Sequence, residues 1–363
     1  MALDSRLVVR RGDFVLDVAL TVDDGDVVAL LGPNGSGKST LLSAIAGLVP
    51  VESGTVSVNG RLLTSAGDGH RVSVPAHLRG VGLLGQDPLL FPHLSAQDNV
   101  AFGPLAKRTR GPSARTMASD WLTAVGVRGL EGRKPAALSG GQQQRVAIAR
   151  ALAANPDVLL LDEPMASLDI QTAAAIRGML RGHLARVGLT TILVSHDVVD
   201  AVMLADRVVI LEDGLIVDDG PTARVLERPV NRFAAALVGM NFVRGVAEGG
   251  AVVVADGRRF RGSGGGEGSR GLVDGAEVCA VFPPIAVRLG AEAPAPALRS
   301  AVNSWWGTVA ALEPAASGIR LRLAGDSVIA ELPTSEVLAA GIAPGSVVSL
   351  AVTDTAVRVY PSP

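Results

Sequence analysis

The sequence predicts an α/β domain over residues 1–238, followed by a smaller all-β domain over residues 239–363. With 363 residues, the chain is longer than one ordinary domain. Short, wholly apolar runs such as Val27–Leu31 and Val158–Leu161 alternate with helical patterns, and such runs are typical of parallel strands buried on both faces of a sheet. After Met240, short valine-rich segments alternate with glycine and proline turns, which indicates a β domain.

Each predicted domain has a further subdivision. The stretch over about residues 87–155 is more helical than its surroundings and predicts a helical subdomain within the α/β domain. The tail divides into two similar halves, about residues 241–290 and 300–361, in which Asn241–Gly245 corresponds to Asn303–Gly307. Such self-similarity predicts two copies of one β unit, and a chance alignment of common residues is the alternative.

The composition disfavours several classes of protein. Although 48% of the residues are hydrophobic, the sequence contains no uninterrupted apolar stretch of the ~18–20 residues that a membrane-spanning helix needs. The 33 basic and 35 acidic residues nearly cancel, so we expect no nucleic-acid partner. The single cysteine, Cys279, forms no internal disulfide and suits a reducing compartment.

A glycine-rich loop predicts a phosphate-binding site. The segment Gly32–Ser39 fits the pattern G-x-x-x-x-G-K-[ST] and lies between an apolar strand and a helix, which is the context that this motif needs. Its backbone amides and the following helix N-terminus favour an anion, Lys38 can reach nucleotide β- and γ-phosphates, and the Ser39 hydroxyl can bind Mg²⁺. An ordinary glycine-rich turn is the alternative. The predicted nucleotide-binding residues here are Gly32, Pro33, Asn34, Gly35, Ser36, Gly37, Lys38, Ser39 and Thr40.

Two acids end the second apolar run. Val158–Leu161 is followed directly by Asp162 and Glu163, which places two carboxylates at the edge where open α/β sheets bind ligands. We expect Asp162 to bind Mg²⁺ and Glu163 to polarise an attacking water. Solvated acids at a strand end would be the better interpretation if the phosphate loop were absent.

Further motifs resemble those of ATP-binding cassette (ABC) ATPases. Leu138–Gln142 (LSGGQ) resembles the family signature, Gln86 the Q-loop glutamine, Ser167–Asp169 the D-loop and His196 the switch histidine, and all occur in the family's order. The resemblance therefore implies a P-loop NTPase fold with a helical subdomain and an ATPase that uses ATP and Mg²⁺.

The resemblance also implies a site shared by two chains. Ser139, Gly140, Gly141 and Gln142 form a second group of amides suited to an anion, and in the family the signature of one subunit closes over the ATP of the other. We therefore expect a homodimer with ATP between the subunits. The implied catalytic residues are Glu163, His196 and Gln86, with Asp169 at the ATP and with Ser39, Gln86 and Asp162 at Mg²⁺.

The residue that stacks on adenine is left open between two candidates. The family usually places an aromatic ring before the phosphate loop, where this sequence has Arg11 and Phe14. Phe14 could stack through its ring and Arg11 through its planar guanidinium. Phe14 could equally be a core residue of a strand.

The whole chain resembles the ATPase subunit of a molybdate-type ABC importer. Ser300–Gly307 and Ala356–Arg358 resemble the OB-like β repeat (Mop or TOBE type) that follows such cassettes. The resemblance implies integral membrane permease subunits, a periplasmic-type or lipoprotein solute-binding protein, and a peripheral location at the cytoplasmic face of the membrane. Importers of sulfate, iron or another solute are the alternative, and a non-transport cassette or a pure oxyanion-binding protein are alternatives of another class.

The tail departs from oxyanion-binding repeats at two positions. Those repeats generally carry arginine before the asparagine and lysine in the last strand, where this chain has Val302 and, approximately, Val352. Because both cations are missing, charge-assisted hydrogen bonds to a dianion are lost. We expect a structural or regulatory tail without strong oxyanion binding.

Overall fold

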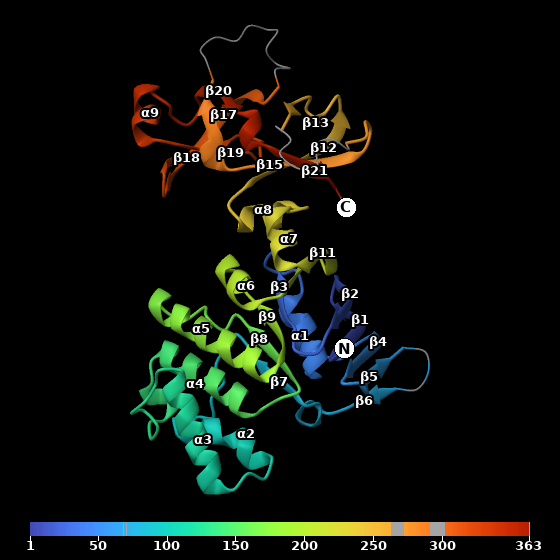
Figure 1. The fold of residues 1–363 in the computed structure, drawn as a ribbon, viewed down its shortest axis with the longest axis vertical. Coiled ribbons are helices and arrows are strands. Elements are labelled where there is room, and N and C mark those ends of the chain that lie inside the picture. Colours follow the sequence, from blue (N-terminus) through green and yellow to red (C-terminus); the bar gives the residue numbers. More distant parts are fainter. Residues whose placement is uncertain (68, 70, 263–271, 291–301, 363) are drawn as a thin grey trace. The chain divides into compact units, whose positions relative to one another are not determined.

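The computed structural model describes residues 1–67, 69, 71–262, 272–290 and 302–362, and it divides into two compact units, Met1–Ala223 and Arg224–Pro363 (Figure 1). The division falls earlier than the boundary that the sequence suggests at residue 238. The reason is that the segment after Ala223 packs with the β domain: the Tyr360 hydroxyl donates to the carbonyl of Pro229 at 2.7 Å, and Ala235 is buried against Tyr360.

A six-stranded sheet forms the centre of the first unit. Its order is β11-β10-β3-β9-β8-β7, and every pair is parallel except β10 and β11. The three strands β3, β8 and β9 are buried at every position, as the apolar runs predict. The bounds are β3 Val27–Leu31, β7 Val81–Leu84, β8 Val158–Asp162, β9 Thr190–Val194, β10 Arg207–Glu212 and β11 Leu215–Pro221.

A second, antiparallel sheet in this unit was not predicted from the sequence. Its order is β2-β1-β4-β5-β6, and helix α1, Lys38–Ala46, shares one apolar core with both sheets. This core fixes the helix that follows the phosphate loop. The strand bounds are β1 Leu3–Arg11, β2 Phe14–Val22, β4 Ser53–Val58, β5 Arg61–Ala66 and β6 Val72–Ser73.

The other face of the central sheet is covered by helices. A second core joins them through small residues, mostly alanine, valine and leucine, and α2, α3 and α4 lie together in Figure 1. None of the described helices combines the length and the apolarity needed to cross a membrane. The bounds are α2 Ala96–Ala106, α3 Gly111–Ala124, α4 Gly140–Ala153, α5 Ile170–Val187 and α6 Val198–Leu204, with 3₁₀ turns at Ala76–Leu78 and Pro135–Ala137.

The described residues of the second unit form two five-stranded antiparallel sheets, ordered β14-β13-β12-β15-β21 and β19-β18-β17-β20-β16. The predicted order, an α/β domain followed by a mainly β domain, is observed, with short helices α7, α8 and α9 as additions. The bounds are α7 Thr222–Glu227, α8 Arg232–Leu237, β12 Asn241–Glu248, β13 Ala251–Val253, β14 Arg259–Phe260, β15 Glu277–Phe282, β16 Val287–Leu289, β17 Ser304–Ala315, β18 Gly318–Leu323, β19 Ile329–Leu332, α9 Thr334–Ala339, β20 Val347–Val352 and β21 Arg358–Pro361, with 3₁₀ turns at Pro284–Ala286 and Asp354–Ala356.

The two halves of this unit exchange their last strands. β16, from the first half, pairs with β20, and β21, from the second half, pairs with β15. Two asparagines make matching links: the Asn241 amide exchanges hydrogen bonds with the backbone of Ile329, and the Asn303 amide does so with Arg261. We interpret the sheets as two copies of one unit whose cores form together. Residues 263–271 and 300–301 of the predicted halves lie outside the described residues.

Candidate functional site

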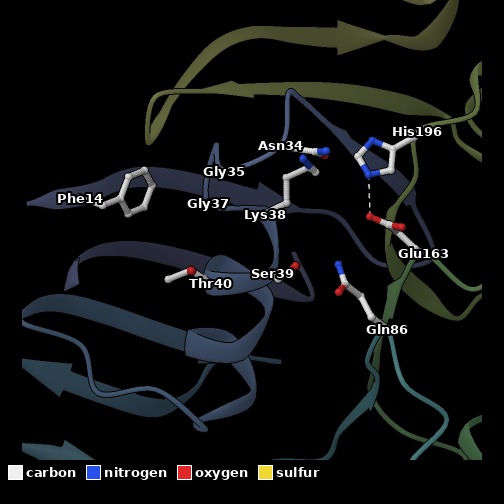
Figure 2. A pocket seen from close by; sticks show the side chains of 10 residues that line it. All are labelled: Phe14, Asn34, Gly35, Gly37, Lys38, Ser39, Thr40, Gln86, Glu163 and His196. Atoms are coloured by element: carbon white, nitrogen blue, oxygen red, sulfur yellow. Dashed lines mark hydrogen bonds and ion pairs between the residues drawn. The ribbon is translucent and has the colours of Figure 1, made fainter. Parts of the chain in front are cut away.

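The carboxyl ends of four neighbouring parallel strands bring the candidate residues together. β3 leads into the phosphate loop, β8 into Glu163, β9 into His196 and β7 into Gln86. Because neighbouring parallel strands end at the same edge of a sheet, these segments converge there. They line a cavity of about 580 Å³ that also includes Phe14, as Figure 2 shows.

The phosphate loop owes its path to glycine. Gly37 has φ 106°, and a Cβ built on it would lie 2.9 Å from the ring of Phe14, so both the backbone conformation and the space exclude a side chain. Gly37 is the N-cap of α1. The first turn of α1 therefore presents free amides and the positive end of the helix dipole at the cavity.

Lys38 is the first residue of α1, and its side chain folds back over the phosphate loop. Its Nζ donates to the carbonyls of Gly32 at 2.8 Å and Pro33 at 2.7 Å, and the side chain is buried. Burial lowers the pKa of Lys38, an effect that the nearby carboxylates of Glu163 and Asp162 oppose. A phosphate group would supply the compensating charge that the backbone carbonyls provide only in part.

Asp162 and Ser39 fit a magnesium ion. Asp162 is buried, and its Oδ1 has no hydrogen-bond partner among the described residues. Burial raises the pKa of Asp162, while a hydrogen bond from Ser39 and the charge of Lys38 act in the opposite direction. A buried carboxylate oxygen without a partner, next to a hydroxyl, is the hard oxygen ligand set that Mg²⁺ prefers.

Glu163 and His196 form the most direct pair in the cavity. His196 Nε2 lies 2.6 Å from Glu163 Oε1, which Figure 2 shows as a dashed line. Glu163 has φ 52°, a left-handed conformation that is unfavourable for a residue with a side chain, and its amide donates to Val194 in β9 at 3.0 Å. The backbone thus holds the Glu163 carboxylate toward the phosphate loop, where it can polarise a water.

The structure separates the two candidates for adenine stacking. Phe14 lines the cavity, together with Asn34, Thr40 and Gln86, whereas Arg11 does not. Arg11 is exposed at the end of β1, where it pairs with Phe14 across the β1–β2 hairpin. The Phe14 ring also packs against the core beneath the phosphate loop, so it belongs to both the cavity and the core.

The signature segment lies outside this cavity. Ser139 is the N-cap of α4, where its Oγ accepts from the Gln142 amide at 3.3 Å and the Gln142 side chain accepts from the Ser139 amide at 3.0 Å. Asp169 caps α5 in the same way, accepting from the Thr172 amide at 3.0 Å. Ser139, Gly140, Gly141, Gln142 and Asp169 are therefore on the surface of this chain without lining its own phosphate cavity.

Sequence reasoning missed the residues that support His196. Arg177, in α5, pairs with Asp197 and Asp200 beside the histidine. The two acids are visible in the sequence after His196, but nothing in the sequence indicates that Arg177 is their partner. Only the packing of α5 against α6 brings them together.

Comparisons with known proteins identify the family. Residues 15–166 match the family model described as ABC transporter. The chain is 50% identical, over 77% of its length and 75% of the relative's, to the molybdenum import ATP-binding protein of Mycobacterium tuberculosis. It is 43% identical to an Fe(3+) ions import ATP-binding protein of Streptomyces coelicolor, over 67% of this chain and 68% of that one.

A solved structure agrees with these relatives. A dimeric, post-hydrolysis structure of the ATP-binding cassette MJ0796 with ADP and Pi is 31% identical and has a TM-score of 0.53. It covers 61% of this chain and 98% of its own. The chain therefore belongs to the ABC transporter ATP-binding family. It is an ABC-type ATPase that binds ATP, as the motifs predict.

Replacing the Phe14 ring tests whether it stacks on the adenine base. Because stacking of an aromatic side chain on a base contributes about 1–3 kcal/mol, we expect Phe14→Ala to raise the Kd for ATP roughly tenfold. Arg11, which pairs with Phe14 across the hairpin but lies outside the cavity, supplies the matched control. Arg11→Ala should leave the Kd unchanged. Equilibrium titration with a fluorescent ATP analogue checks both, and an unchanged Kd for Phe14→Ala would remove the stacking role.

The buried charge of Asp162 predicts a pH-dependent stability. Its raised pKa means that the ionised carboxylate is less favourable in the folded protein than in the unfolded chain. The free energy of unfolding therefore falls as the pH rises from the ordinary pKa of aspartate through the raised pKa of Asp162, and this loss is complete at higher pH. At neutral pH we expect Asp162→Asn to raise the Tm of the nucleotide-free protein by about 2 °C or more. The gain should shrink as the pH falls and the native Asp162 becomes protonated.

Asp213→Asn is the control for this test, and stabilisation by Mg²⁺ and ATP is a second measurement. Asp213→Asn removes an exposed carboxylate in the same unit and should leave the Tm unchanged. Added Mg²⁺ and ATP should stabilise the native protein more than Asp162→Asn, because the substitution removes a proposed ligand. An Asp162→Asn protein that is less stable than the native one at neutral pH would contradict the account.

Proposed function

We propose that the chain is the ATP-hydrolysing subunit of a molybdate importer. The observation that carries the proposal is the 50% identity to the molybdenum import ATP-binding protein over 284 residues. Because the first unit ends at Ala223, this match includes part of the β domain. Relatives named for sulfate or thiosulfate and for Fe(3+) are 43% identical over shorter stretches, which makes import of those solutes the alternative.

We infer that two copies act head to tail, with one ATP at each of two shared sites. The signature residues lie outside their own chain's phosphate cavity, yet the Gly140 and Gly141 amides in the first turn of α4 are suited to a phosphate. The MJ0796 structure is a dimer with ADP and Pi bound, which supports the same arrangement. ATP would then favour the closed pair because it contacts both chains only there.

The residues of each site divide the work of hydrolysis. Gly35, Gly37 and Lys38 bind the phosphates, and Ser39, Asp162 and Gln86 would hold Mg²⁺, which neutralises phosphate charge when bound. Glu163 accepts a hydrogen bond from the attacking water and polarises it toward the γ-phosphorus. His196, in contact with Glu163, holds that carboxylate and reaches toward the γ-phosphate.

The described surface near Gln86 offers an apolar docking site for a permease helix. Phe91 and Phe102 pack with ring centroids 4.6 Å apart. Phe102 is exposed, and so are Leu89 and Leu105. Arg150 supports the cluster: its guanidinium lies over the Phe91 ring and donates to the carbonyl of Leu89. We place the protein at the cytoplasmic face of the membrane, with the permease and a solute-binding protein as partners.

The β domain carries a structural or regulatory role in this proposal. The Asn303 amide is already engaged, since Nδ2 donates to the Arg261 carbonyl at 2.8 Å and to Asp354 Oδ1 at 2.5 Å. Val302 is exposed and supplies no positive charge. A carboxylate at this position repels a dianion, which supports weak oxyanion binding at Asn303.

Uptake measurements test the function. In a strain that lacks the gene, we expect the native chain to restore uptake of radiolabelled molybdate. We expect Glu163→Gln to fail, because losing a general base costs about 10²–10⁴-fold in rate. The purified Glu163→Gln protein should still bind ATP, which separates a lost reaction from a lost fold.

The same strain distinguishes the alternatives. Restored uptake of labelled sulfate or iron, with molybdate uptake unchanged by the gene, would replace molybdate as the solute and leave the ATPase assignment intact. A Glu163→Gln protein that hydrolyses ATP at the native rate would refute Glu163 as the base.

A further inference from the structure

A buried charged network lies directly behind the His196 turn. It joins helix α5 to the N-terminus of α6 and consists of four side chains, Arg177, Ser195, Asp197 and Asp200. None of these four residues lines the phosphate cavity. None of the four is among the residues already assigned to ATP or to the attacking water, although all four line a second cavity together with Glu163 and His196.

Arg177 is the only cation in the network. Its Nε donates to Asp200 Oδ1, and its Nη2 donates to Asp197 Oδ2 at 2.7 Å. Arg177 is 8% exposed and Asp200 is 2% exposed, so solvent screens this pair little. One guanidinium thus binds two carboxylates at once, which the planar fork of arginine allows and a lysine ammonium does not match.

The network forms hydrogen bonds with the residues on both sides of His196. Ser195 Oγ donates to Asp200 Oδ2 and accepts from the Asp197 amide at 3.0 Å. Asp197 also caps α6, accepting from the Val199 amide at 2.9 Å. Because Ser195 and Asp197 are both fixed, the backbone of the residue between them is fixed as well.

This turn sets where the imidazole lies. The His196 side chain projects from it to Glu163, 2.6 Å away, and the imidazole is 42% exposed. Among the described contacts, Glu163 therefore holds the imidazole ring of His196, and the network holds the backbone from which the ring projects. A cavity of about 500 Å³, lined by Arg177, Ser195 and His196 among others, leaves room for the turn to shift when the network is broken.

Removing the Arg177 guanidinium would leave the negative charges of Asp197 and Asp200 without a compensating positive charge. Asp197 and Asp200 lie close together, and Asp200 is almost fully buried. A buried carboxylate that loses its partner is strongly unfavourable, so the two acids would separate or admit water. Either change moves Ser195 or Asp197, and with them His196.

We propose that Arg177 is a positioning residue for ATP hydrolysis, which holds the Ser195–Asp197 turn so that His196 meets Glu163. The inference rests on the proposed role of His196. Arg177 does not line the phosphate cavity, and its described hydrogen bonds go to Asp197 and Asp200. Loss of the Arg177 side chain lowers the rate of the chemical step because the His196 imidazole is no longer held in position.

Substitutions of Arg177 in the full chain supply the first test. We expect Arg177→Met to lower kcat for ATP hydrolysis about 10–100-fold, the size of loss found when the outer partners of metal-binding residues are removed, with KM for ATP within about twofold. Arg177→Lys should have an intermediate kcat, because its ammonium can hold one of the two carboxylates. Loss of affinity and rate together in Arg177→Met would indicate a merely structural role and overturn the proposal.

Arg207→Met is the matched control. Arg207 is an ion-paired arginine of the same unit, bonded to Asp219 and to the carbonyl of Thr21, and it does not line the phosphate cavity. Its replacement should lower the Tm without changing kcat at 25 °C. An equal loss of kcat in both variants would trace the effect to general destabilisation and contradict the positioning role.

A double-mutant cycle with His196 separates the inference from the function on which it rests. If Arg177 acts through the imidazole, Arg177→Met should cause no further loss of kcat in a His196→Ala protein. If Arg177→Met lowers kcat as much in the His196→Ala protein as in the native one, the proposed role of Arg177 is overturned, and the role of His196 is not. A His196→Ala protein with native kcat would instead refute the role of His196, and the inference with it.

Ser195→Ala keeps the proposal testable if Arg177→Met fails to fold. It removes the hydroxyl that joins Asp200 to the Asp197 amide and leaves Arg177 with both carboxylates. We expect a several-fold lower kcat with unchanged KM, and no effect in the His196→Ala background. A native kcat for Ser195→Ala would contradict the proposal.

Discussion

The parallel pairing of β9 with both β3 and β8 is the constraint on which the site depends. β3 delivers the phosphate loop, β8 delivers Asp162 and Glu163, and β9 delivers His196. The amide of Glu163 donates to the carbonyl of Val194, the last residue of β9, so the proposed general base is tied to the strand that leads into His196. A shift of register in either pair would separate groups that must act within one hydrogen-bond length.

Several features of the site lower the stability of the folded protein, and the rest of the unit offsets this loss. Lys38 and Asp162 are buried, and Glu163 has a left-handed backbone. Each of these disfavours the folded state, and the two apolar cores on either face of the sheet offset them. The Arg177 network fits the same pattern, because it keeps charged groups in a buried place where they orient the His196 turn.

Sequence reasoning succeeded where chemistry is local. The run Val27–Leu31 and the loop to Ser39 contain a strand, a turn and a helix start in consecutive residues, so their structure follows from short-range rules. The antiparallel sheet around β1 and the exchange of β16 and β21 depend on pairings between distant segments. Arg177 was missed for the same reason, and the choice between Phe14 and Arg11 needed the hairpin register to show which side chain lines the cavity.

The central claim is that a complete ATP site needs residues from two chains, and mixing two inactive variants tests it most directly. Lys38→Ala removes the phosphate lysine, and Ser139→Arg blocks the signature face, so each protein alone should hydrolyse almost no ATP. Mixed dimers contain one site with both native residues, and the account predicts that ATPase activity returns on mixing. A mixture no more active than its separate components would contradict the shared site.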